Sequence, residues 1–124
     1  MHVIRHAIQA ANRHGLEPTL VLGVIAQESS FRKEATSSAG AQGLMQVMPD
    51  IHADLTARML RETETLYDVA PNVKTGTHIL AGYLREAGGN LSKALHRYSG
   101  GANGYEEKVL RHKEQFDRFL PMDS

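Results

Sequence analysis

Cysteine and tryptophan are both absent from this chain of 124 residues, and aromatic residues make up only 6% of it. Without cysteine the chain has no disulfide framework, no thiolate nucleophile and no zinc finger. An excess of charge of one sign is also absent, because 14 lysines and arginines balance 14 acidic residues. This balance argues against a strongly basic nucleic-acid binder or a polybasic membrane binder. It leaves open a polyanionic or glycan substrate held by local contacts.

Long hydrophobic runs are missing as well. The longest apolar run covers residues 20–26, about seven residues, whereas a membrane-spanning helix needs about 18. The first 15 residues predict an amphipathic helix and lack the apolar core and cleavage site of a signal peptide. We therefore expect no membrane span, and either no export by the signal-peptide route or a signal already removed. The length predicts a single domain over residues 1–124.

Apolar residues recur with the helical period of 3.6 almost everywhere. This pattern predicts helices over residues 3–14, 19–29, 50–60, 71–86, 91–98 and 105–120. Asp50 and Asn90 are expected to cap two of them, and Pro71 to open a third. Residues 32–43 are small and polar and predict a loop, followed by a short apolar segment at 44–48. The predicted fold is mainly α, a compact bundle of about six or seven helices.

One acidic residue differs from the others in its setting. Glu28 ends the run LVLGVIAQE, and the residues three, four and seven positions before it are Ile25, Val24 and Val21. Its helical face is therefore apolar, and a desolvated carboxyl has a raised pKa. A carboxylic acid still protonated near neutral pH is suited to general acid catalysis. Two structural alternatives remain, namely a polar end before a loop and an ion pair with Arg32.

Four ordered motifs carry a family resemblance. Residues 28–31 are Glu-Ser-Ser-Phe, and residues 39–49 are Ala-Gly-Ala-Gln-Gly-Leu-Met-Gln-Val-Met-Pro. Residues 72–76 have the form Asn-x-x-x-Gly, and Tyr98 precedes Ser99-Gly100-Gly101. Together they resemble the catalytic core of soluble-lytic-transglycosylase-type enzymes, which belong to the lysozyme-like superfamily and cut peptidoglycan. The resemblance covers about residues 16–120 and implies a lysozyme-like helical domain with a glycan-binding groove.

The resemblance implies a reaction that uses one carboxyl group. Glu28 would protonate the oxygen between N-acetylmuramic acid and N-acetylglucosamine, then take the proton of the C6 hydroxyl as that oxygen closes a 1,6-anhydro ring. Tyr98 would place its hydroxyl close to the Glu28 carboxylate, unless it is only a packing residue. No matching motif offers a second acid, since Asp50 resembles a helix cap. Two-carboxylate hydrolysis is therefore the less favoured mechanism.

Substrate contacts are implied at five further positions: Ser37, Gln46, Met48, Asn72 and Tyr105. Ser37 would bond near the N-acetyl group, while Gln46 and Met48 would line the groove. Structural alternatives stay open, because Ser37 has the sequence setting of a loop cap and Asn72 that of a residue orienting the helix entrance. Leu44 and Met45 are predicted core residues, Tyr83 is predicted to pack in the core, and Gly40 and Gly43 are expected at tight turns.

Three other functions are alternatives to a lytic transglycosylase. A lysozyme-like muramidase shares the fold, and a non-catalytic glycan-binding module is favoured by Ser99, where the family commonly has Asn. A plain helical partner-binding domain leaves Glu28 and the motifs unexplained. No cofactor is implied, and no metal site is expected, because His2 and His6 lack an accompanying carboxylate pattern and HExxH is absent.

Partners and location follow from the resemblance alone. The expected partner is the peptidoglycan glycan strand, with no nucleic acid and no membrane span. Small members of this family serve secretion systems, pili, conjugation or phage entry, so a secretion-system, pilus or phage-tail partner is implied without a choice among them. The expected location is the periplasm or the cell wall.

Overall fold

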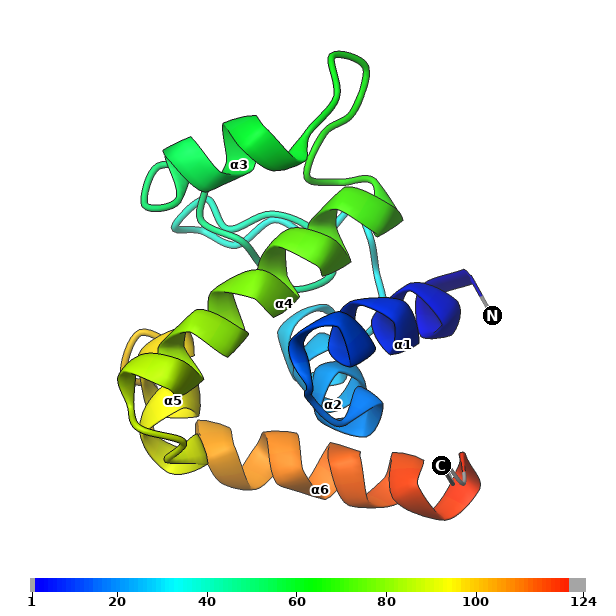
Figure 1. Cartoon of the computed structure of the whole chain (residues 1–124), viewed down its shortest axis with the longest axis vertical. Helices are drawn as coiled ribbons and strands as arrows, with labels where there is room; N and C mark the ends of the chain where they lie inside the picture. The colour runs from blue at the N-terminus through cyan, green and yellow to red at the C-terminus, as the bar shows by residue number, and fades with distance from the viewer. Residues whose placement is uncertain (1, 121–124) are drawn as a thin grey trace.

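The computed structural model describes residues 2–120, which form six α-helices and no β-strand. The helices are α1 (His2–His14), α2 (Pro18–Ser29), α3 (Ala53–Met59), α4 (Val69–Glu86), α5 (Leu91–Tyr98) and α6 (Tyr105–Phe119). Figure 1 shows α4 crossing the molecule diagonally, with α3 above it, α1 and α2 to one side and α6 along the base. The predicted mainly α architecture is confirmed.

Of three predicted helix starts, the one at Asn90 is confirmed, and those of α3 and α4 differ from the structure. Asn90 caps α5, because its Oδ1 accepts the Lys93 N–H at 3.0 Å. Helix α4 begins at Val69, two residues before the proline expected to open it. The prediction that Asp50 caps the third helix was wrong. A separate turn, closed by the His52 N–H on the Met48 carbonyl at 3.1 Å, precedes α3, and the cap position falls on His52.

Helix α2 forms the centre of the main core. It packs between α1 and α6, and its residues from Thr19 to Ile25 are all buried. Gly23 permits the close approach of α6, since a Cβ there would lie 2.8 Å from the Val109 carbonyl oxygen. Burial of these side chains is worth roughly 1.5–3 kcal/mol for each large aliphatic residue. This packing fixes the C-terminal end of α2, where Glu28 lies.

A second, smaller cluster lies on the other side of α4. It contains Val47, Leu66 and Ile79, with α3 packed over it through Leu55. The loop between α2 and α3 runs between the two clusters and carries the glycine-rich motif. Two isolated β-bridges, Thr36 with Gln42 and Gln42 with Val47, fold this loop on itself. The loop is therefore a folded unit held between α2 and α4.

Candidate active site

Glu28 lies in the last turn of α2, half-buried beside the glycine-rich loop. Burial raises the pKa of its carboxyl above the usual 4.5, and the Tyr105 hydrogen bond opposes that shift. The alternative of an ion pair with Arg32 is not realised, because Arg32 Nε donates to the Ser29 carbonyl at 3.4 Å. Among the described residues no other acidic group contributes to the Glu28 shift. Glu28 is thus a partly desolvated carboxyl group with a raised pKa.

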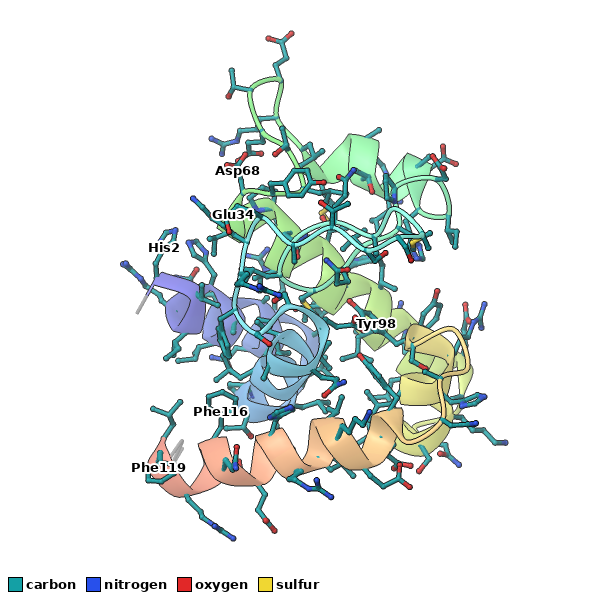
Figure 2. All side chains as sticks on the ribbon, turned by 180° about the vertical axis from the view of Figure 1, so that it is seen from behind. His2, Glu34, Asp68, Tyr98, Phe116 and Phe119 are labelled. Atoms are coloured by element: carbon teal, nitrogen blue, oxygen red, sulfur yellow. The ribbon has the colours of Figure 1, made fainter. Side chains whose placement is uncertain are left out.

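Two tyrosines approach this carboxyl from α5 and α6. The Tyr105 hydroxyl donates to Glu28 Oε2 at 2.6 Å, so the residue expected to contact substrate contacts the acid. Burial and the Glu28 charge raise the pKa of the Tyr98 phenol. Its hydroxyl, however, donates to the Met45 carbonyl at 2.8 Å. Figure 2 shows Tyr98 at the junction of the loop with α4 and α5.

Asn72 holds the loop from beneath. Its side chain is fully buried, with Oδ1 accepting the Met45 N–H at 2.8 Å and Nδ2 donating to the Gln42 and Leu66 carbonyls at 2.8 and 2.6 Å. The expected substrate contact is therefore wrong for this conformation, because the side chain has neither exposure nor a free donor. The alternative, that Asn72 orients the entrance of its helix and the adjoining loop, agrees with these contacts.

Gly43 and Gly76 explain why the motifs require glycine. Gly43 has φ +77°, and a Cβ there would lie 2.2 Å from Asn72 Nδ2. A Cβ on Gly76, one helical turn after Asn72, would lie 2.6 Å from Met45 Sδ. The Asn-x-x-x-Gly pattern therefore forms one face of α4 on which Gly43 and Met45 rest. Leu44 and Met45 are fully buried, as predicted.

Gln46 and Ser37 also bond within the loop. Gln46 Nε2 donates to the Ala35 and Gly43 carbonyls at 3.0 and 2.9 Å, and its φ of +53° is stabilised by this arrangement. Ser37 Oγ accepts the Ala41 N–H at 3.0 Å, which is the loop-cap geometry considered from the sequence. Both side chains are partly exposed. Each shapes the loop and still presents an oxygen atom with remaining acceptor capacity.

A small pocket of about 30 Å³ adjoins this loop. Its lining joins three of the expected residues, Gln46, Met48 and Tyr98, to four others: Val47, His52, Ile79 and Tyr83. Tyr83 is half-buried and packs against the smaller core cluster, as expected, and its ring also lies edge-on to Tyr98 with 6.4 Å between the ring centroids. His52 was not among the expected site residues. A lone histidine without metal-ligand spacing gives no sequence signal for a place in this pocket.

Arg97 adds a cation beside this pocket. Its guanidinium lies 4.5 Å from the centroid of the Tyr83 ring and forms an ion pair with Glu86. Within residues 2–120 no group of three or more histidine, cysteine or acidic side chains is placed to hold a metal ion. The same residues contain no helix long and apolar enough to cross a membrane.

Comparison with known proteins places this helical domain in a class. The structure of an inactive mutant of the lytic transglycosylase Slt from Pseudomonas aeruginosa superposes with a TM-score of 0.86 over 97% of this chain and 24% of that one. The two sequences are 21% identical, so this match establishes the fold, a lysozyme-like helical domain. The family description "Transglycosylase SLT domain" matches residues 5–119. The chain belongs to the transglycosylase SLT domain family.

Curated relatives share parts of this chain. A transglycosylase of Enterobacteria phage PRD1 is 39% identical over 94 residues, which are 76% of this chain and 33% of that protein. A membrane-bound lytic murein transglycosylase C of Haemophilus influenzae is 40% identical over 77 residues, 58% of this chain and 22% of that protein. The chain thus spans a third or less of the length of these relatives.

Proposed function

We propose that this domain is a peptidoglycan lytic transglycosylase in which Glu28 is the single general acid and base. The observation that carries the proposal is the Glu28 carboxyl, half-buried, with a raised pKa and a hydrogen bond from Tyr105. Membership of the transglycosylase SLT domain family supports the same activity. A two-carboxylate hydrolase needs a second acid within ~5–9.5 Å, whereas the four family motifs contain Glu28 as their one acidic residue.

The first step cleaves the β-1,4 bond between N-acetylmuramic acid and N-acetylglucosamine. Tyr105 donates to Oε2, so the catalytic proton is carried on Oε1 of the neutral acid. Glu28 transfers this proton to the bridging oxygen as the bond from that oxygen to the anomeric carbon breaks. The 2-acetamido oxygen of the muramic acid shields the positive charge on that carbon. A positioned acid contributes ~10²–10⁴-fold to such a step.

The second step uses the same carboxyl as a base. Glu28 is now an anion, and the Tyr105 hydrogen bond stabilises its charge. It takes the proton of the C6 hydroxyl, and O6 forms a bond to the anomeric carbon of the same sugar. Glu28 is restored to its neutral form, and the product is a 1,6-anhydromuramic end with no water consumed.

Other loop residues have supporting roles in this proposal. Ser37, Gln46 and Met48 line the approach of the glycan, and Tyr98 fixes the Met45 backbone beside the acid. The substrate is then the peptidoglycan glycan strand, and the site of action is the cell wall or periplasm. Similarity to a phage transglycosylase and to a membrane-bound murein transglycosylase supports this setting, with a phage-tail, pilus or secretion-system partner as the associated assembly.

The test is digestion of purified peptidoglycan followed by mass spectrometry of the products. We expect muramic ends lighter by one water than the reducing ends of a hydrolase. Reducing ends would instead identify a muramidase, and wall binding without any product would identify a non-catalytic module.

A matched pair of variants assigns the acid. Glu28→Gln should abolish cleavage and keep the helical circular dichroism spectrum, because the amide cannot donate the proton. Glu34→Gln removes an exposed acid from the loop that follows α2 (Figure 2) and should leave the rate unchanged. Cleavage at the normal rate by Glu28→Gln would remove Glu28 from the mechanism.

A further inference from the structure

Helix α1 contains no acidic residue, although the whole chain is neutral. It carries Arg5 and Arg13 together with three histidines. Along one side of the helix, His6, Gln9 and Arg13 follow each other at spacings of three and four, so their side chains share a face. This face adjoins α4, against which α1 packs.

A pocket of about 190 Å³ opens between the two helices. Ala10 and Ala70 are its two small residues, and the polar lining consists of His6, Gln9, Arg13 and Lys74. Arginine and lysine thus enter one hollow from different helices. No acidic side chain belongs to the lining.

The two cations of this pocket have no partner within the described residues. Arg97, Lys113 and Arg118 form the ion pairs found among the described residues, and most other cations, including the two of this pocket, are unpaired and exposed. Arg13 and Lys74 form neither an ion pair nor a side-chain hydrogen bond among residues 2–120. Asp68, the acid just before α4, accepts the Thr65 N–H at 2.9 Å through Oδ2. Arg13 and Lys74 are both exposed and line the same hollow, so their charges act together on an anion bound there.

The pocket faces away from the candidate active site. Residues 70 and 74 lie two positions from Asn72 and Gly76, which is about 200° around the helix. Asn72 and Gly76 support the glycine-rich loop, so the pocket lies on the other side of α4. The loop lies behind α4 in Figure 1 and in front of it in Figure 2, whereas α1 and the first half of α4 come forward in Figure 1.

We propose that this pocket binds the phosphate group of an anionic ligand. The planar guanidinium of Arg13 can bond two phosphate oxygens, while Lys74 supplies a point charge and Gln9 an amide donor. A phosphate monoester carries about −1.5 to −2 charges at neutral pH, which matches two cations better than a single carboxylate does. The proposal is independent of the glycan-cleaving activity, because it uses none of the residues around Glu28.

Calorimetric titration with inorganic phosphate at low ionic strength tests the site. Arg13→Ala/Lys74→Ala should raise the dissociation constant about tenfold or more, since two charge-assisted contacts are lost. The matched control, Lys108→Ala/Arg111→Ala, removes two exposed cations of α6 and should change it less than twofold. Equal weakening by both pairs would overturn the proposal in favour of diffuse attraction.

Two further measurements distinguish binding inside the pocket from attraction to its charges. Ala70→Leu fills the hollow without changing charge and should weaken phosphate binding while the melting temperature is kept; unchanged binding would place the anion elsewhere. The His6 ring resonances should shift on adding phosphate to the wild type and not to Ala70→Leu. Acetate at the same ionic strength should bind more weakly, and equal acetate binding would overturn the assignment to phosphate.

The source of the phosphate is then distinguished with vesicles. Binding to phosphatidylglycerol vesicles but not to phosphatidylcholine vesicles, lost in Arg13→Ala/Lys74→Ala, would support the proposal with a lipid headgroup as ligand. Phosphate binding without vesicle binding would support it with a soluble or polymer-borne phosphate. Failure of phosphate and vesicles to bind the wild type would overturn it.

Discussion

Asn72 and Glu28 are both polar residues set among apolar neighbours, yet they differ in burial and in the number of their hydrogen bonds. Asn72 is fully buried, and its oxygen and amide group form three hydrogen bonds to backbone atoms. Glu28 is half-buried and has a single side-chain partner, Tyr105. The hydrogen-bonding groups of Asn72 are all paired within the fold, whereas Glu28 keeps one carboxyl oxygen without a partner among residues 2–120.

The difference separates a structural polar group from a reactive one. A buried polar group adds to stability only when its hydrogen bonds are made, and Asn72 meets this condition. A partly desolvated carboxyl with few partners reduces stability but holds its proton at higher pH, which suits proton transfer. The family motifs therefore include residues of both kinds, and partner counts distinguish them better than motif position does.

The largest expected effect is on the Asn72 side of this comparison. Asn72→Ala should lower the free energy of unfolding by about 3 kcal/mol, because the Met45 N–H and two carbonyls lose their partners. Urea denaturation followed by circular dichroism measures the change. On the same helix, Thr75 is also fully buried, and its hydroxyl has no partner among the described residues.

Thr75→Val is therefore the matched control for Asn72→Ala. It removes a buried hydroxyl without breaking a hydrogen bond, so stability should be unchanged or slightly higher. A loss of stability comparable to that of Asn72→Ala would mean that the burial of polar groups on α4, rather than their hydrogen bonds to the loop, determines the change in the free energy of unfolding.

A smaller effect is expected from Tyr105→Phe, on the Glu28 side. Loss of the phenol removes the donor that stabilises the carboxylate, so the pKa of Glu28 should rise further. Since the acid form then persists to higher pH, the alkaline limb of the activity profile should move upward. The value of kcat/KM at its optimum should fall about tenfold, the equivalent of roughly 1.4 kcal/mol.

Tyr98→Phe provides the contrast for this prediction. It breaks the bond to the Met45 carbonyl and leaves the Tyr105 contact with Glu28 in place. Activity should fall, while the alkaline limb should stay where it is in the wild type. An equal movement of the limb in both variants would show that Tyr105 acts through the loop rather than through Glu28.

The sequence predicted which segments are helical, because apolar residues recur along them at helical spacing or, in α2, form a continuous buried run. Asn90 illustrates this, since its side chain caps α5 through a contact three residues away. The prediction that Asp50 caps α3 was wrong because an additional turn precedes this helix. Backbone atoms close that turn, and side-chain identity gives little indication of it. Local signals therefore predicted which segments are helical better than they predicted where each helix begins.

The site was predicted less completely, because its contacts are distant in sequence. The raised pKa of Glu28 followed from its own helix, and that prediction is confirmed. Its bond to Tyr105 spans 77 positions, and the bond from Tyr98 to Met45 spans 53. The resemblance assigned the Glu28 carboxylate to Tyr98, whereas Tyr105 bonds to it in the structure, since only the packing of α5 and α6 decides which hydroxyl reaches the acid.

The smallest effect concerns the stability cost of the reactive carboxyl itself. The pKa of Glu28 is raised in the folded chain, so between the usual 4.5 and the folded value the native state binds more protons than the unfolded state. The contribution of Glu28 to the free energy of unfolding is therefore present at low pH and is lost as pH rises through that window. Glu28→Gln removes the titration, so it should be more stable than the wild type at neutral pH and similar below about pH 4. Melting temperatures of both proteins from pH 4 to 8 measure this difference, and a gap that narrowed as pH rises would contradict a raised Glu28 pKa.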